Sequence, residues 1–287
     1  MSFSSIKELL EARPELPLWQ AVLEDDLAER DVPREESLAR MGRLWAAMKE
    51  AVAGYDPDRR SASGLVGGAG GLMDRAEPRL CGPFTQRVIA TALKTGECNA
   101  CMRRIVAAPT AGASGVLPAV LIPAQEKLGC SDRQMVEALY VAGAFGEVIA
   151  ARASIAGAEG GCQAEVGSAS GMAAAALTAL QGGSREQMAH ACAMALKNLL
   201  GLVCDPVAGL VEVPCVKRNV AGAMNALACS EMALAGVASA IPCDEVIDAM
   251  RAVGDALPAS LRETGQGGLA ATPTGRSVRL RPAERPE

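Results

Sequence analysis

From Phe84 onward the sequence alternates between long runs rich in Ala and Leu and short breaks rich in Gly and Pro. The runs carry apolar residues at helical spacing, and none shows the period of two that a half-buried strand requires. Glycine and proline end helices and shape the connections between them. The breaks read APTAGASG, AGAEGGCQ, CDPVAGLVEVPC and ETGQGGLAATPTG. This alternation predicts an all-α fold, a multi-helix bundle whose functional residues gather in Gly/Pro-rich loops.

Composition supports the same fold class and excludes several partners. Half of the 287 residues are apolar but only 2% are aromatic, and small or straight side chains suit closely packed helices. The net charge of −5 offers no basic surface for nucleic acid. No run approaches the roughly 18–20 apolar residues of a membrane span. Because the first residues carry charges where a signal peptide needs apolar ones, we expect a cytoplasmic protein.

The chain divides by composition into three parts. Residues 1–60 are charged and amphipathic and predict helices that pack on the core. Residues 61–275 hold the helical runs and the Gly/Pro-rich breaks and form the predicted main domain, and residues 276–287 are charged, contain proline and predict a loose tail. At residues 64–71 the stretch GLVGGAGG could be a hinge, a close-packed turn or a phosphate-binding loop, although no Walker Lys-Ser/Thr follows it.

The chain contains one histidine, His190, in a stretch with helical spacing. A Ser-His-Asp triad would have to use it, and no serine lies in a G-x-S-x-G sequence. Two-histidine zinc sites are excluded by count. An enzyme with this sequence would therefore rely on a metal or cofactor, or on an imidazole from a partner.

Ten cysteines in a reducing compartment are expected to be thiols or metal ligands. Cys98 and Cys101 form a C-x-x-C, but the surrounding sequence is helical and no second C-x-x-C completes a zinc site. Several others are explained as small buried residues or turn residues. They are Cys81, Cys130, Cys192, Cys229 and Cys243.

Three cysteines lie instead in Gly/Pro-rich loops, namely Cys162, Cys204 and Cys215. Three thiolates suit an iron–sulfur cluster, and a [4Fe–4S] cluster held by only three cysteines would leave one iron open as a Lewis acid. A three-cysteine zinc site, or three core cysteines that coincide in these loops, remains an alternative at this point.

The sequence resembles the α subunit of the iron–sulfur-dependent L-serine dehydratases. The resemblance extends from about Gly64 to Gly275. It is carried by AAPTAGASGVLP, AEGGCQAEVGSASGMAAAA, KNLLGLVCDPVAGLVEVPCVKRNVAGAMNA and SLRETGQGGLAATPTG.

The resemblance implies that Cys162, Cys204 and Cys215 hold a [4Fe–4S] cluster. It also implies an all-helical α domain that converts L-serine to pyruvate and ammonia without pyridoxal phosphate. Single-chain members carry a β domain with a catalytic histidine in a Ser-Ser-Ser-His segment, which this chain lacks, so a separate β subunit and a hetero-oligomer are expected. Some members end in a cysteine that reaches the cluster, whereas no cysteine follows Cys243 here.

Two segments offer groups for the serine carboxylate. Thr110 and Ser114 lie in the turn that opens a helix beside free backbone N–H groups, although they could equally be helix caps. Lys217 and Arg218 follow Cys215 and could bind the same carboxylate or be solvated surface charges.

Asn219 and Glu165 complete the set of candidates. Asn219 could orient the substrate amine or a cluster sulfide. Glu165 could serve as base or as an outer acceptor, or be an acidic residue in the first turn of a helix. Glu165 and Lys217 are the candidate catalytic residues. For Arg262 and Glu263 we expect a structural ion pair.

Other functions remain compatible with this sequence. L-Threonine, or L-cysteine with sulfide as leaving group, could replace L-serine in the same chemistry. A non-catalytic helical scaffold, whose cysteines only fill the core, is the alternative from another class.

Overall fold

A computed structural model describes residues 3–278 of the chain. Helices make up 66% of the structure, and the described residues contain no strand. The prediction of an all-α, multi-helix fold is confirmed. Of the predicted tail, residues 279–287 lie outside the described residues.

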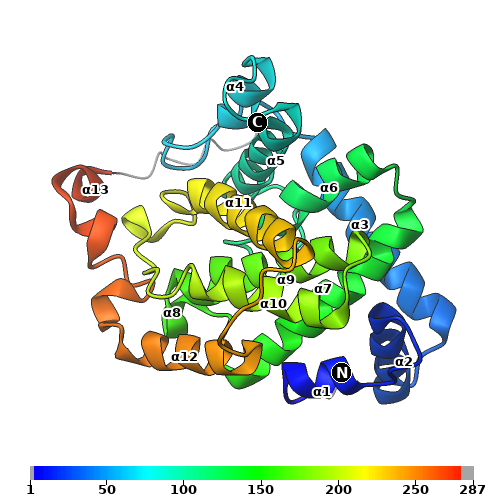
Figure 1. Cartoon of the computed structure of the whole chain (residues 1–287). Coiled ribbons are helices and arrows are strands. Elements are labelled where there is room, and N and C mark those ends of the chain that lie inside the picture. Colours follow the sequence, from blue (N-terminus) through cyan, green and yellow to red (C-terminus); the bar gives the residue numbers. More distant parts are fainter. Residues whose placement is uncertain (1–2, 279–287) are drawn as a thin grey trace.

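The α-helices and the π- or 3₁₀-helical turns (η) follow one another along the chain (Figure 1). They are α1 (Ile6–Glu11), α2 (Leu18–Arg30), α3 (Arg34–Ala53), α4 (Ala69–Arg75), α5 (Pro83–Ala100), α6 (Val116–Leu128), α7 (Asp132–Arg152), α8 (Gly157–Gly160), η1 (Gln163–Gly167), α9 (Ser168–Leu180), α10 (Arg185–Lys197), η2 (Val207–Gly209), α11 (Cys215–Leu234), α12 (Cys243–Ala256), η3 (Ala259–Leu261), η4 (Gly268–Ala271) and α13 (Pro273–Ser277).

Helix α9 lies at the centre of the bundle. It packs against α7, α10, α11 and α6, and residues 168–178 are all buried. Its small side chains permit this close packing: a Cβ added at Gly171 would lie 3.0 Å from the Cys192 sulfur. The abundance of alanine in the sequence thus corresponds to helices that approach one another closely around α9.

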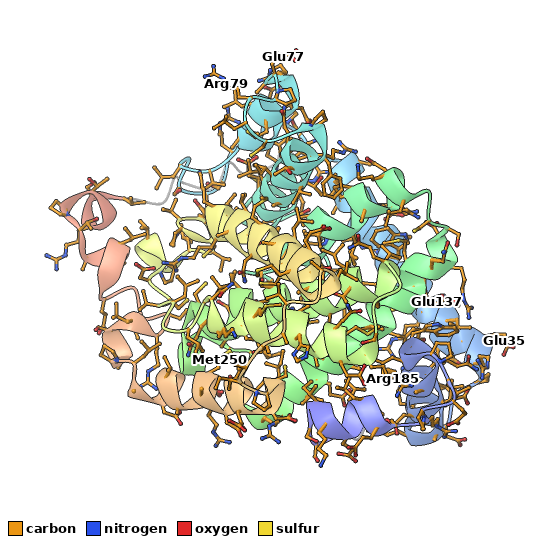
Figure 2. The ribbon with its side chains drawn as sticks, viewed as in Figure 1. Glu35, Glu77, Arg79, Glu137, Arg185 and Met250 are labelled. Atoms are coloured by element: carbon orange, nitrogen blue, oxygen red, sulfur yellow. The ribbon has the colours of Figure 1, made fainter. Side chains whose placement is uncertain are left out.

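The N-terminal helices share the core of the rest of the chain. One hydrophobic cluster extends from Ile6 to Met250, and α2 and α3 both pack on α7. Trp45 of α3 is buried and its indole N–H donates to Asp132 Oδ1 at 3.0 Å. The Arg185 guanidinium, labelled in Figure 2, holds the α1–α2 connection by donating to four backbone carbonyls, those of Leu10, Ala12, Arg13 and Leu16.

The glycine-rich stretch at residues 64–71 forms a close-packed turn and the first residues of α4. The buried Glu97 carboxylate accepts the backbone N–H groups of Ala69 and Gly70 at 2.9 and 3.1 Å. A Cβ at Gly70 would lie 2.6 Å from Lys94 Cγ, so this glycine allows α4 to approach α5. Because a carboxylate already accepts the N–H groups that a phosphate would need, the phosphate-binding alternative is disfavoured.

Helix α7 is, among the described helices, the one long and apolar enough to span a membrane by length and composition. In the structure 67% of that apolar window is buried by protein, because α9, α3 and α2 surround the helix. Its hydrophobicity is therefore that of a core helix.

Candidate active site

The three loop cysteines come together in one region of the fold. Cys162 lies between α8 and η1, Cys204 follows α10, and Cys215 is the first residue of α11. Cys162 and Cys204 are buried, and Cys215 is half-buried. The charges of Cys162 and Cys215 each raise the pKa of Cys204, so the three thiols lie within electrostatic reach of one another.

Burial raises the pKa of each of these thiols. The pKa of Cys162 rises to about 11 and that of Cys215 to about 12, and the pKa of Cys204 is raised further. Burial is the first cause in all three, and the neighbouring Glu165 charge adds to it. The Arg218 charge acts in the opposite sense on Cys162 and Cys215. A cationic group bound among these sulfurs would favour the thiolate form that metal ligation requires.

The backbone before Cys162 depends on glycine. Gly161 has φ +75°, and a Cβ there would lie 2.7 Å from Leu257 Cδ1. After the cysteine the chain forms the π-helical turn η1, a rare conformation that is frequent at functional sites. The Gln163 side chain fixes this turn by donating to Met250 O at 2.9 Å and accepting from Gly201 N at 2.9 Å.

Asp205 and Arg218 anchor the loop between Cys204 and Cys215. Arg218 Nη2 lies 2.9 Å from the carboxylate of buried Asp205, and its Nη1 donates to Val203 O at 2.7 Å. The other Asp205 oxygen accepts from Leu269 N at 2.8 Å. The ion pair therefore joins the cysteine loop to α11 and to the glycine-rich stretch at 264–275.

Glu212 anchors the same loop on its other side. It is 4% exposed and accepts from Ser61 Oγ at 2.6 Å and from the Ser63 hydroxyl. Sequence reasoning missed both Asp205 and Glu212. The signal was present, because they are the only charged residues between the two cysteines and a carboxylate in an apolar loop is buried only when it is paired.

The segment after η3 runs alongside Cys204. Cys204 N donates to Leu261 O, and Glu263 N donates to Cys204 O, both at 2.8 Å. Glu263 has φ 61° and its charge raises the pKa of both Glu165 and Cys204. The expected Arg262–Glu263 ion pair is absent among the described residues, and the prediction is wrong. Backbone pairing with Cys204 holds this segment instead.

The Glu165 carboxylate contacts the Cys204 thiol. Its Oε1 accepts from Thr110 Oγ1 at 2.8 Å, and its Oε2 lies 3.9 Å from Cys204 Sγ. Burial raises its pKa above the ordinary value, and the Thr110 hydrogen bond opposes that shift. A Cβ at Gly157 would lie 2.7 Å from Glu165 Oε2 and 3.0 Å from Cys204 Sγ, so a glycine is needed beside both.

The remaining predicted residues have different surroundings. Asn219 donates to Gly112 O and Cys215 O and accepts from Gly115 N, so its amide joins the Thr110 turn to α11. The Ser114 hydroxyl is buried and has no hydrogen-bond partner among residues 3–278. Lys217 is exposed, and its side chain forms no hydrogen bond or ion pair within the described part of the chain.

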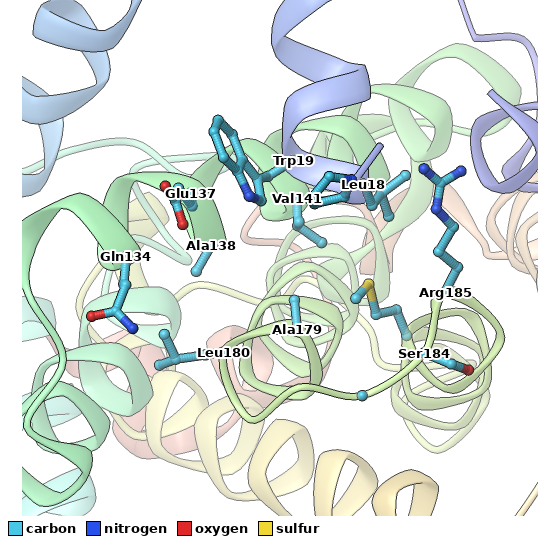
Figure 3. Close-up of a pocket in the computed structure, with 13 residues that line it drawn as sticks. Leu18, Trp19, Gln134, Glu137, Ala138, Val141, Ala179, Leu180, Ser184 and Arg185 are labelled. Carbon is cyan, nitrogen blue, oxygen red and sulfur yellow. The ribbon is translucent and has the colours of Figure 1, made fainter. Parts of the chain in front are cut away.

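Residues outside this region have local structural explanations. His190 Nδ1 accepts from Ser239 N at 3.3 Å. The buried Cys98 thiol donates to Ala51 O, and burial raises the pKa of both Cys98 and Cys101. A cavity of about 380 Å³ lies between α2, α7, α9 and α10, and no cysteine lines it. Figure 3 shows the side chains that line this cavity.

The three thiols could ligate a single metal ion or a cluster of several irons. Within the described residues, no three Cys, His, Asp or Glu side chains converge closely enough to hold one metal ion. The sulfurs that hold a multi-iron cluster bind different irons and need not converge on one point. Cys162, Cys204 and Cys215 are therefore compatible with a cluster without forming a ready-made site for a single ion.

Comparison with known proteins places the chain in a family. A family model described as "Serine dehydratase alpha chain" matches residues 13–270. A "Probable L-serine dehydratase, alpha chain" of Bacillus subtilis (strain 168) is 50% identical over 281 residues, which cover 96% of this chain and 94% of the relative. The "L-serine dehydratase, alpha chain" of Peptoniphilus asaccharolyticus is 50% identical over 200 residues, covering 70% of this chain and 68% of the relative.

Longer relatives match over a part of their length. The "L-serine dehydratase 2" of Escherichia coli (strain K12) is 44% identical over 181 residues, covering 62% of this chain and 40% of that relative. All three relatives are named L-serine dehydratases, and the alpha-chain family model matches residues 13–270 of this chain. The chain belongs to the serine dehydratase alpha chain family.

Proposed function

We propose that this chain is the catalytic α subunit of an iron–sulfur-dependent L-serine dehydratase, which converts L-serine to pyruvate and ammonia without pyridoxal phosphate. The family membership supports the reaction class. One observation carries the proposal: Cys162, Cys204 and Cys215 lie close together, and the Glu165 carboxylate lies beside them.

These residues fit a [4Fe–4S] cluster. Cys162, Cys204 and Cys215 would hold it, Gly157 leaves the room beside Cys204, and Arg218 adds positive charge next to the sulfurs. When bound through three cysteines, such a cluster supplies an iron without a protein thiolate that can act as a Lewis acid.

Glu165 is the proposed base for the Cα proton of the substrate. Its burial raises its pKa toward the range in which a carboxylate is an effective proton acceptor. The Thr110 hydroxyl, 2.8 Å away, fixes the carboxylate and opposes the rise of its pKa. Proton transfer to Glu165 would give the aminoacrylate once water is lost, and its imine tautomer hydrolyses to pyruvate and ammonium.

The turn before α6 is the proposed site of the substrate carboxylate. Ser114 is buried and its hydroxyl has no protein partner among the described residues, so it can donate to a ligand. Thr110 lies at the other end of the turn and contacts Glu165. Asn219 has a positioning role and does not bind the substrate amine, because three hydrogen bonds to the backbone occupy its amide.

A separate β subunit and a cytoplasmic location complete the proposal. The name "alpha chain" of the relatives supports a partner chain, and the longer single-chain relatives support it further. The chain's only histidine accepts a backbone N–H away from the cysteines, so an imidazole in the site would have to come from that partner.

The proposal is tested by oxygen-free assay of the chain together with its β partner. We expect turnover of L-serine to pyruvate, and much weaker turnover of L-threonine and L-cysteine. A comparable kcat/KM for L-cysteine would assign the enzyme to the desulfidase alternative. A colourless protein without turnover of any of the three would support the scaffold alternative.

A further inference from the structure

A second cavity lies between α8 and α12, next to the segment that carries Cys162. It has a volume of about 270 Å³, which is large enough to hold a small amino acid. Met250 of α12, labelled in Figure 2, forms part of its wall. The cysteines do not line it, so it is a space apart from the candidate active site.

Two positive and two negative side chains line this cavity. They are Arg251, Arg262, Glu159 and Asp255. Within residues 3–278, neither the half-buried Arg262 side chain nor the Asp255 carboxylate forms a hydrogen bond or an ion pair. The other two are engaged only in part, because Arg251 donates to Arg152 O at 3.3 Å and one Glu159 oxygen accepts from Ser154 Oγ at 2.7 Å.

We propose that this cavity is a binding site for a small zwitterionic α-amino acid. A guanidinium binds a carboxylate through two parallel hydrogen bonds, and a carboxylate accepts from an ammonium group. Because the two pairs of lining charges cancel, the cavity does not suit a phosphate or a divalent cation. A ligand with one carboxylate and one ammonium matches both signs at once.

The cavity wall is shared with the cysteine loops. Gly160 and Ala164 line it and lie on either side of Cys162 in the sequence. Gly254 packs α12 tightly on this wall, since a Cβ there would lie 2.9 Å from Gly160 Cα. An amino acid bound here would contact the segments that position Cys162. A ligand in this cavity could therefore influence the position of Cys162 in the candidate active site.

Calorimetric titration of the full-length chain, prepared without oxygen, tests the proposal with L-alanine as the probe. L-Alanine has no β-hydroxyl group and cannot lose water, so the heat reports binding alone. We expect saturable binding of L-alanine and at least about tenfold weaker binding of propionate and of ethylamine, which each carry one of its charges. Propionate binding as tight as that of L-alanine would overturn the zwitterion assignment.

Two variants on different segments locate the site. Arg262→Gln and Asp255→Asn should each weaken this binding about 10- to 100-fold. Arg79→Gln, an exposed arginine far from α12 in Figure 2, is the matched control and should bind normally. Asp255 is exposed, so Asp255→Asn should not disturb folding. Weaker binding in that variant therefore cannot be attributed to a folding defect, as it could be in Arg262→Gln. Wild-type affinity in both, or loss only in Arg262→Gln, would refute the site.

Discussion

An alanine at Gly157 would place a methyl group between the Glu165 carboxylate and the Cys204 thiol. The added Cβ would lie 2.7 Å from Oε2 and 3.0 Å from Sγ, whereas ordinary contact begins at 3.4 Å. The carboxylate would have to move by about 0.7 Å to restore that distance. Gly157 does not have positive φ, so alanine is compatible with the backbone and the perturbation is confined to these contacts.

The magnitude follows from the tolerance of catalytic geometry. Productive arrangements are held to within about 0.5 Å, and a misplacement of about 1 Å can reduce the rate about 100-fold. We therefore expect Gly157→Ala to lower kcat about 10- to 100-fold. The overpacking should reduce the free energy of unfolding by about 1–3 kcal/mol, so the protein should remain folded.

The assay is oxygen-free turnover of L-serine, with iron content and chemical denaturation measured on the same preparation. Gly143→Ala is the matched control, because a Cβ at Gly143 in α7 has nothing within 4 Å. It should keep full activity and gain up to about 1 kcal/mol of stability from helix propensity. Wild-type kcat and iron content in Gly157→Ala would refute the packing argument.

Three further variants test separate parts of the site. Arg218→Gln leaves the buried Asp205 carboxylate unpaired and should lower the free energy of unfolding by about 2–4 kcal/mol, measured with denaturant. Arg218→Lys should recover part of this loss. An unchanged denaturation midpoint in Arg218→Gln would contradict the anchoring role. Thr110→Val removes a hydrogen bond that lowers the Glu165 pKa, so the acidic limb of the pH profile of kcat/KM should move to higher pH. A shift of that limb to lower pH would exclude Glu165 as the base. Cys98→Ala and Cys101→Ala should keep iron and activity, because neither cysteine is a proposed ligand. Loss of iron in one of these variants would contradict the assignment of the ligands to Cys162, Cys204 and Cys215.

The fold class and the three cysteine loops that come together could be predicted from local sequence. Alanine-rich runs without a period of two correspond to α9 and its neighbours, whose buried faces consist of small side chains. The Gly/Pro breaks that predicted shaped loops contain Cys162, Cys204 and Cys215, and the structure brings these loops together. Both inferences use only short-range pattern.

The partners that hold the loops could not be predicted in the same way. Nothing near Glu212 in the sequence points to Ser61, and nothing near Asp205 points to Leu269, because these contacts join segments far apart in the chain. Neighbours in sequence were also misleading. Arg262 was expected to pair with the next residue, but its side chain lines a cavity while the backbone around it bonds to Cys204.

The central claim is that Cys162, Cys204 and Cys215 together hold an iron–sulfur cluster. Iron and acid-labile sulfide analysis of oxygen-free protein tests it most directly, on the wild type and on the alanine variant of each cysteine. The account predicts about four of each per wild-type chain and a loss of both in every variant. Wild-type protein that contains neither iron nor sulfide, or variants that retain both in full, would contradict it.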